Sequence, residues 1–219
     1  MKNKEKVFAK GYCFTKLFIF FFLGCLLGTY YEEILFFLKH GKYSRRSGLL
    51  WGPFSPTYGF GVVIFIFFLG RNNKDRGIIK TFIYAALIGG ITEFAVSWIS
   101  DIIFDVQFWD YSHEFLNIMG RTTIPFMIFW GIGGTVLMKF IYPFLSKLIE
   151  KIPYQLGKVI YLILLIFMTL DMIVTYTAFG RMTLRNHGVR PFTFVGKFYD
   201  HVYPNEYMYK RFPVMEPDP

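Results

Sequence analysis

Hydrophobic residues along the chain gather in five blocks that are separated by short polar segments. The blocks cover about residues 14–38, 58–69, 78–104, 122–145 and 159–179. A helix needs about 20 residues, at 1.5 Å rise each, to cross the ~30 Å hydrocarbon core of a bilayer, and all blocks but the second reach that length. The pattern therefore predicts an all-α fold, a polytopic transmembrane helix bundle with about five spans.

The second block follows a segment rich in glycine, proline and aromatic residues, which includes Pro53 and Pro56. It reaches spanning length only if part of this loop between spans 1 and 2 enters the bilayer. Non-helical backbone survives at that depth only where protein or a wet cavity satisfies its N–H and C=O groups. A short span beside a broken segment indicates a pocket. An ordinary loop with interfacial aromatics is the alternative.

Composition supports a membrane protein. The chain is 54% hydrophobic and 18% charged, against about 25% charged in a soluble domain. The net charge of +9 comes mostly from cations beside the hydrophobic blocks, where they contact anionic headgroups of membrane lipids. We therefore predict lipid rather than nucleic-acid partners. Two cysteines in or beside the first block and four scattered histidines predict neither disulfides nor a metal site, and no cofactor motif is present.

The polar segments predict the orientation. Segments 71–80 and 147–158 are basic, whereas segment 101–121 is acidic apart from Arg121. By the positive-inside rule the basic segments are cytoplasmic and the acidic one is outside. The N-terminus, with lysines at positions 2, 4, 6 and 10, is then cytoplasmic. Residues 1–180 are expected to form the transmembrane domain, and residues 181–219 an aromatic, basic tail along the interface.

Acidic residues inside the spans carry the functional argument, because a buried charge costs ~2.5–3.5 kcal/mol even on a lenient insertion scale. Gly28 and Glu32 share one helix face, and so do Glu93, Ser97 and Asp101, because each is four residues from the next. The adjacent Glu33 is expected at the interface instead. Asp171 pairs with Thr175 in the last span.

These carboxylates all fall in the outer half of the bilayer if the predicted orientation holds, where outer-side arginines can neutralise them. One interpretation is an outward-facing pocket for a polar or charged small molecule, with Asp171 as support. The other is a structural ion-pair network that fixes the register of the helices. The predicted pocket residues are Glu32, Arg46, Tyr58, Glu93, Asp110, Tyr111 and Arg121.

Four motifs in one order give a resemblance to a known family. They are the run from Arg46 to Gly61, Gly28 with Glu32, the helical Glu93, and Trp109-Asp110-Tyr111-Ser112 followed by Asn117-Ile-Met-Gly120-Arg121. Over roughly residues 15–180 the chain resembles the bacterial ABC-transporter permease family of the CmpB type, also called ABC-transporter type IV. The chain has Arg45-Arg46-Ser47-Gly48 where the family has Asn-Arg-Gly, so this departure leaves either Arg45 or Arg46 as the counterpart of the family arginine, with spacing to Gly52 as the only guide.

The resemblance implies a transport component of a bacterial cell membrane, without enzymatic activity of its own, that is driven by a separate ATPase. No phosphate-binding Gly-rich loop with lysine is present, so we do not expect the chain to hydrolyse ATP. Two alternatives stay open. The chain is a structural or regulatory partner of another membrane protein, or a membrane enzyme in which Glu32 and Glu93 act as acid and base on a lipid or isoprenoid.

Overall fold

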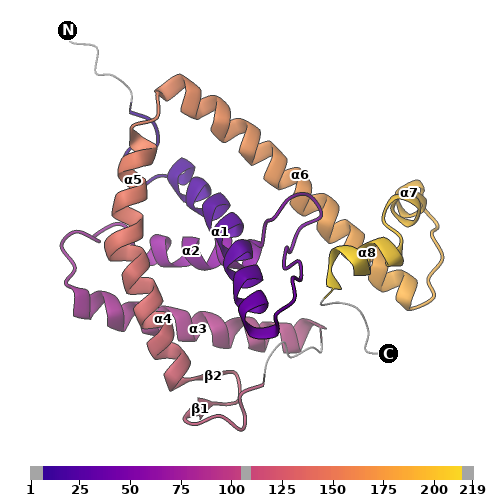
Figure 1. Cartoon of the computed structure of the whole chain (residues 1–219), viewed down its shortest axis with the longest axis horizontal. Helices are drawn as coiled ribbons and strands as arrows, with labels where there is room; N and C mark the ends of the chain where they lie inside the picture. The colour runs from indigo at the N-terminus through magenta and orange to yellow at the C-terminus, as the bar shows by residue number, and fades with distance from the viewer. Residues whose placement is uncertain (1–6, 105–109, 214–219) are drawn as a thin grey trace. The chain divides into compact units, whose positions relative to one another are not determined.

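A computed structural model of the chain describes residues 7–104 and 110–213, and Figure 1 labels its elements. The helices are α1 Phe14–His40, α2 Pro56–Leu69, α3 Ile78–Phe104, α4 Ile124–Val136, the π-helix Leu137–Ile141, α5 Tyr142–Glu150, α6 Tyr154–Asn186, α7 Phe194–Val202 and α8 Asn205–Arg211. The strands β1, Asn117–Ile118, and β2, Thr122–Thr123, form one short hairpin. The predicted all-α fold is confirmed.

Within the described residues, four segments are long and apolar enough to cross a membrane. They are Phe14–His40, Ile78–Ile99, Ile124–Glu150 and Tyr154–Asn186. The 14 residues of α2 make it shorter than these, as its hydrophobic block predicts. The last helix continues past residue 180 to Asn186. Asp105 and Trp109 lie outside the described residues, as do all but one of the N-terminal lysines.

The chain divides into two compact units, which we describe separately. The first unit comprises residues 1–17 and 62–154, and the second comprises residues 18–61 and 155–219. α1 begins in the first unit and continues into the second, whereas α2 begins in the second and ends in the first.

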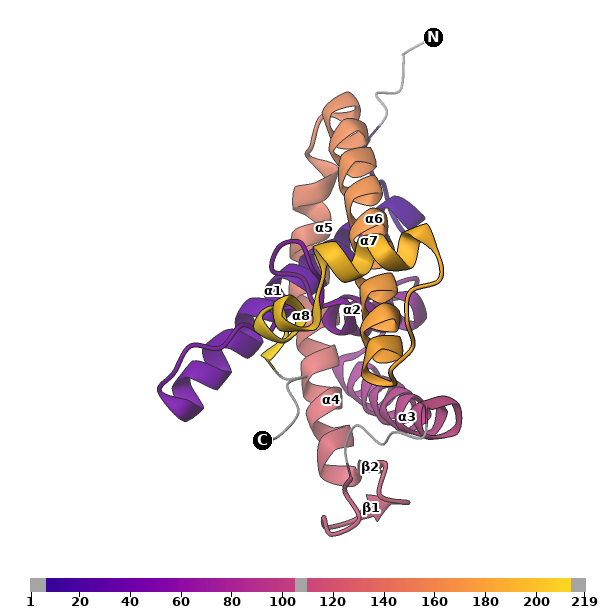
Figure 2. The same cartoon turned by 90° about the vertical axis from the view of Figure 1, so that its right-hand side faces the viewer.

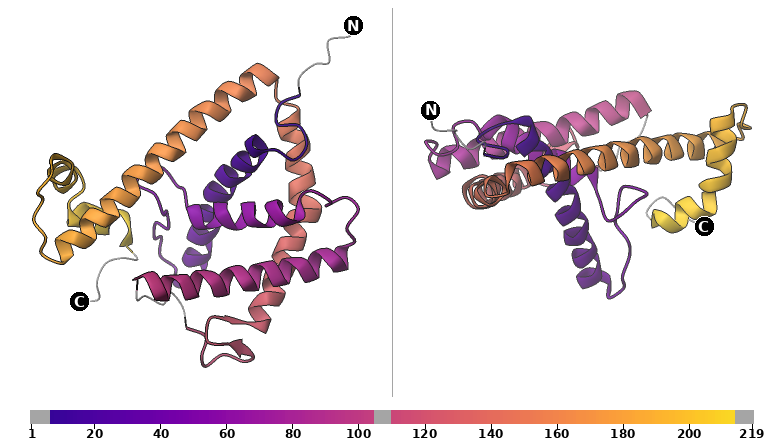
Figure 3. Two further views of the ribbon diagram at one scale, coloured as in Figure 1. Left: turned by 180° about the vertical axis from the view of Figure 1, so that it is seen from behind. Right: turned by 90° about the horizontal axis from the view of Figure 1, so that it is seen from above.

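The first unit is built on the crossing of α3 and α4 (Figure 3). On each of the two helices, large side chains pack against small residues of the other helix. A Cβ on Gly90 would lie 2.6 Å from the Met127 side chain, and one on Gly131 would lie 2.7 Å from the Phe82 ring. Small residues let helix backbones approach closely within a bilayer, where van der Waals packing replaces the hydrophobic effect as the driving force.

One end of this unit gathers three basic segments that are far apart in sequence. Glu150 at the end of α5 accepts hydrogen bonds from Lys16 Nζ at 2.5 Å and from the Gly11 amide at 2.9 Å. Lys139, in the π-helix, donates to the carbonyls of Asn73 (2.6 Å) and Arg76. The N-terminal segment packs on the end of α5 through Glu150 and lies beside loop 70–77, where the Arg71 guanidinium is 5.9 Å from the centre of the Tyr12 ring. It therefore brings the three basic segments together, and the β1–β2 hairpin lies at the opposite end of α4 (Figure 2).

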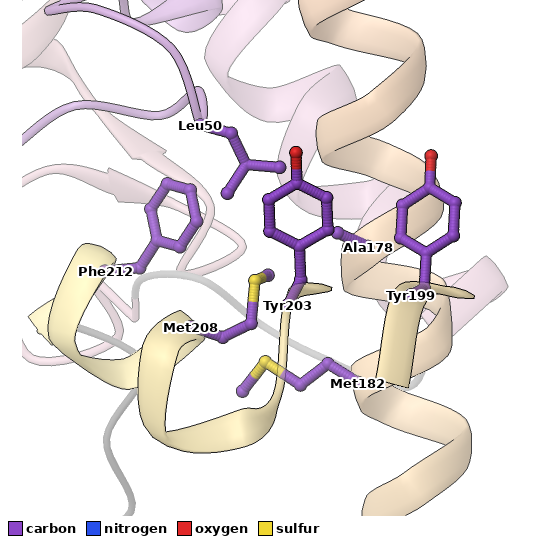
Figure 4. Packing of buried hydrophobic residues seen from close by; sticks show 7 residues of the cluster. All are labelled: Leu50, Ala178, Met182, Tyr199, Tyr203, Met208 and Phe212. Carbon is purple, nitrogen blue, oxygen red and sulfur yellow. The ribbon is translucent and has the colours of Figure 1, made fainter. Parts of the chain in front are cut away.

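The second unit places the tail on α6. Its buried core comprises Leu50, Ala178, Met182, Tyr199, Tyr203, Met208 and Phe212 (Figure 4). In that view Leu50, from the loop after α1, reaches the side chains that α7 and α8 contribute. The tail residues up to 213 thus pack on the loop and on α6.

Asp200 fastens the tail to α6. Arg181 donates to both of its carboxylate oxygens, at 2.7 and 2.8 Å, and Arg185 Nη1 donates at 2.6 Å. These arginines hold the pKa of Asp200 below its usual value. A carboxyl with a lowered pKa stabilises the fold above its unfolded pKa and loses this contribution as the pH falls through the folded value.

We therefore expect the tail to loosen as the pH falls below about 3.9, the pKa of an unfolded aspartate. Amide hydrogen exchange of residues 194–211 in detergent micelles, measured between pH 5 and pH 3, checks this. Asp200→Asn should show fast exchange at both pH values, whereas Glu206→Gln, a change at an exposed position of α8, should behave like the wild type. Equal exchange of wild type and Asp200→Asn at pH 5 would show that the bonds from Arg181 and Arg185 to Asp200 do not hold the tail on α6.

Candidate functional site

Glu93 is the centre of a polar group in the first unit. Thr122 Oγ1 donates to Glu93 Oε2 at 2.6 Å, and the Tyr111 hydroxyl donates to Oε1 at 3.2 Å. Both donors come from the connection between α3 and α4, which lies against the face of α3 that carries Glu93. Glu93 is half-buried. Protein donors therefore hold its carboxylate, while part of the residue stays exposed.

Arg121 joins the same face of α3 one and two turns further along. Its Nη2 lies 2.5 Å from Asp101 Oδ2, and its Nη1 donates to Ser97 Oγ at 3.3 Å. The predicted stripe of Glu93, Ser97 and Asp101 therefore faces the α3–α4 connection along about two turns. An arginine beside a carboxylate lowers the cost of keeping that carboxylate charged in an apolar setting.

Tyr111 serves as a fixed hydrogen-bond donor. Burial and the negative charge of Glu93 raise the pKa of Tyr111 to about 12. The hydroxyl therefore stays protonated and donates a hydrogen bond to the carboxylate. Asp110 is exposed and caps the turn, accepting from the Ser112 amide at 2.8 Å and from its hydroxyl at 2.6 Å. These bonds lower the pKa of Asp110 and tie it to the loop.

Glu32 belongs to a second polar group, in the second unit. Its carboxylate lies near the Tyr58 side chain, close to the start of α2. The Tyr58 ring packs against Gly28, where any side chain would collide with the ring carbons. The predicted stripe of Gly28 and Glu32 is therefore the surface on which Tyr58 lies.

Arg46 lies beside Glu33 instead of Glu32. Its amide donates to Glu33 Oε1 at 3.3 Å, and its guanidinium lies 4.0 Å above the centre of the Phe36 ring. Glu33 is only 7% exposed, so it is covered by protein. The loop after α1 folds back over this second face of the helix and buries it.

The loop between α1 and α2 is held by side chains from far along the chain. Thr175 Oγ1 accepts from the Leu50 amide at 3.0 Å, and Asp171 Oδ1 accepts from the Trp51 amide at 3.1 Å. Asp171 is fully buried, which fits the supporting role predicted for it. The demand that non-helical backbone be satisfied within the protein is met here by α6.

Arg211, at the end of α8, was missed by the sequence analysis. Its Nε donates to the Leu50 carbonyl at 2.9 Å, and its Nη2 donates to Ser47 Oγ at 3.0 Å. The same Nη2 also donates to the carbonyls of Gly52, at 2.7 Å, and Leu49. One guanidinium thus satisfies three main-chain carbonyls of the loop. The sequence offered one indirect signal for it. The main-chain carbonyls of the non-helical loop need hydrogen-bond donors, and neighbouring residues in the sequence do not supply them.

The predicted pocket residues thus fall into two groups. Glu93, Tyr111 and Arg121 lie together in the first unit with Asp110 in the adjoining turn, whereas Glu32, Tyr58 and Arg46 lie in the second. In the first group the Glu93 carboxylate accepts from a phenol, whereas in the second Glu32 lies near Tyr58 and Arg46 contacts Glu33. Such a group can bind a polar or cationic solute through the carboxylate and orient it through the hydroxyl. Among the described residues, no three His, Cys, Asp or Glu side chains are placed to hold a metal ion.

The model of the family described as "Putative ABC-transporter type IV" matches residues 19–176 of the chain. This match covers well over half of the sequence and contains Glu32, Arg46, Tyr58, Glu93 and Arg121. The chain belongs to this family. The resemblance drawn from the sequence motifs is therefore confirmed.

This ABC-transporter type IV protein extends beyond the part that the family model matches. Asp171 and Thr175 lie inside the match, whereas Arg211 lies outside it. A search of curated proteins found no match to the chain, and a search of solved structures found none either. Family membership and four long apolar helices together show a membrane protein related to ABC transporters.

Proposed function

We propose that this protein is the membrane-embedded permease or substrate-capture component of a transporter, with an outward-facing polar pocket around Glu93. The observation that supports this most is the half-buried Glu93 carboxylate inside an apolar helix, held by two hydroxyls. Ionisable groups at such depth commonly mark pathways for polar solutes. The pocket would take a polar or charged small molecule.

The basic end of the first unit supports a cytoplasmic side at that end. Lys10, Arg71, Lys74, Lys147 and Lys151 are all exposed there, and such an excess of cations stays cytoplasmic. The α3–α4 connection, which holds Glu93, would then be outside. This agrees with the orientation that the sequence predicts, with a cytoplasmic N-terminus in the cell membrane.

Energy would come from a separate ATPase subunit docked on the basic end. Loop 70–77 suits this role because hydrogen bonds to the π-helix fix its conformation. Lys139 fixes two of its carbonyls, and Asn73 Nδ2 donates to the Met138 carbonyl of the π-helix at 2.5 Å. A π-helix leaves carbonyls free for such bonds and is frequent at functional sites.

Purification from native membranes in mild detergent, followed by mass spectrometry, tests the proposal. We expect an ATPase to accompany the wild type and to be lost from a variant with Arg71→Glu and Lys74→Glu, which reverses charge on the exposed loop. Lys197→Glu, at an exposed position of α7, should retain the ATPase. A wild-type chain that carries no ATPase would contradict the proposed transport role.

One observation favours the alternative of a structural partner for another membrane protein. The pairing of Arg121 with Asp101 neutralises charges within the chain, as a network that only fixes helix register would do. Under that alternative the purification yields a membrane protein partner in place of an ATPase, and loss of the Glu93 carboxylate weakens assembly only.

A further inference from the structure

The connection between α3 and α4 ends in an exposed apolar tip. Phe115 is 75% exposed and Met119 is 78% exposed, and Leu116 and Ile118 are also exposed. Residues 115–120 include no charged side chain. Large apolar residues gathered on one loop indicate a surface that is covered in the working protein.

The backbone under this tip is fixed by a dense set of hydrogen bonds. Asn117 Nδ2 donates to the carbonyls of Ser112 and Glu114, at 3.2 and 3.1 Å, and Asn117 Oδ1 accepts from the Gly120 amide at 3.1 Å. The Tyr111 amide donates to the Gly120 carbonyl at 2.8 Å. The tip is therefore a preorganised wedge.

Two of the apolar residues also have left-handed backbone conformations. Leu116 has φ of 51° and Met119 has φ of 52°, a region uncommon for residues other than glycine. Such residues persist only where the surrounding structure fixes them, and they cluster at functional sites. The fixed backbone of the loop therefore holds Leu116 and Met119 in their exposed positions.

The tip lies beside the first turn of α4. The Leu116 carbonyl accepts from the amide of Ile124, the first residue of α4, at 3.1 Å. The Tyr111 ring packs on Phe126 with 4.9 Å between ring centres. Ile124 and Phe126 are themselves exposed, so the exposed apolar residues of this helix begin in its first turn, next to the hairpin (Figure 2).

We propose that Phe115, Leu116 and Met119 insert into the interfacial region of the bilayer as a rigid lipid anchor. Its depth would be about 5–10 Å, as for other apolar faces that lie in the headgroup and acyl boundary. Insertion removes apolar surface from water, and a preorganised tip loses little conformational freedom when it binds. The polar base of the loop, with Asp110, His113 and Glu114 exposed, stays in water.

The anchor also fixes the level of the Glu93 group. Tyr111 and Thr122, the two donors to Glu93, flank the tip on either side in the sequence. Since tip and donors share one hydrogen-bonded loop, lipid contact at the tip sets how deep the donors lie. The tip therefore positions the Glu93 group relative to the membrane surface, whether or not that group binds a solute.

Fluorescence quenching in vesicles of phosphatidylcholine and phosphatidylglycerol tests the insertion. Phe115→Cys and Met119→Cys, each in a full chain with Cys13 and Cys25 replaced by alanine, are labelled with nitrobenzoxadiazole. His113→Cys, on the polar base of the same loop, is the matched control. Quenching is measured with a nitroxide on the lipid acyl chain near the glycerol, and separately with iodide in the water.

We expect both tip labels to be quenched several-fold more by the lipid nitroxide than the label at position 113, with blue-shifted emission and weak quenching by iodide. Two tip positions are used so that a variant that does not fold leaves the other. Strong iodide quenching at the tip would show a water-exposed loop and overturn the proposal. Protection from both quenchers would show that protein, such as a second copy of this chain, covers the tip, and would overturn it equally.

Discussion

Replacing Arg211 with alanine is expected to lower the free energy of unfolding by about 3–5 kcal/mol, as for other buried charges whose removal strands their partners. Only 6% of Arg211 is exposed. Its loss leaves the carbonyls of Leu49, Leu50 and Gly52 without their donor. Each unsatisfied buried group costs about 1–3 kcal/mol, and water entering the vacated space offsets part of the sum.

Chemical unfolding in detergent micelles measures this loss, and hydrogen exchange of the Leu50 and Trp51 amides locates it. Lys210→Ala, at the exposed neighbouring position of α8, is the control and should leave both readouts unchanged. Arg211→Lys should fall between the two, because an ammonium keeps the charge but lacks the planar fork. If Arg211→Ala unfolds like Lys210→Ala, the loop is not held by this residue.

Gly134→Leu should separate α3 from α4 or destabilise their packing by about 1–3 kcal/mol, the usual cost of overpacking a tight contact. A Cβ at position 134 would lie 2.6 Å from the Ala85 Cβ and 3.0 Å from the Phe65 ring. Ala85 is fully buried, so it cannot move aside. The leucine side chain beyond the Cβ has still less room.

Gly133→Leu is the matched control, one residue away on the same helix. A Cβ there meets nothing within 4 Å, so the leucine projects into open space. Because glycine is a poor helix former, this change should be neutral or stabilise by up to about 1 kcal/mol. Unfolding of both variants in the same detergent gives the comparison. Equal losses would mean that the helices do not meet through Gly134.

The sequence predicted the long apolar helices well because the blocks of hydrophobic residues coincide with them, whereas α7 and α8 of the tail were not predicted. The bounds of α3, residues 78–104, are the same in prediction and structure, since the preceding glycine and charged loop mark its start. The short α2 and the broken segment before it were also predicted. Their cause is local, because Pro53 and Pro56 interrupt any helix in that segment.

The partners of the loop were beyond sequence reasoning. A four-residue spacing identifies which side chains share a helix face, but not which element packs on that face. Glu33 was therefore expected at the interface, although the returning loop buries it. Arg211 lies 161 residues from the carbonyl of Leu50 that it binds, and no local pattern links residues at that separation.

The polar group in the first unit was largely predictable, because its residues obey local rules. Glu93, Ser97 and Asp101 repeat every four residues, and Arg121 is the single cation of an otherwise acidic segment. Thr122 was not predicted, although it makes the shortest bond to Glu93. A threonine at the start of a hydrophobic block reads as a helix cap, the role that its neighbour Thr123 fills.

The Glu93 group is most directly tested by the small molecules that stay bound after purification from native membranes in mild detergent. Native mass spectrometry of the wild type should show a polar or charged solute, which Glu93→Gln loses because an amide lacks the negative charge. Glu114→Gln, an exposed change in the same connection, should keep that solute. The same bound molecules in Glu93→Gln and the wild type would contradict a binding role for this carboxylate.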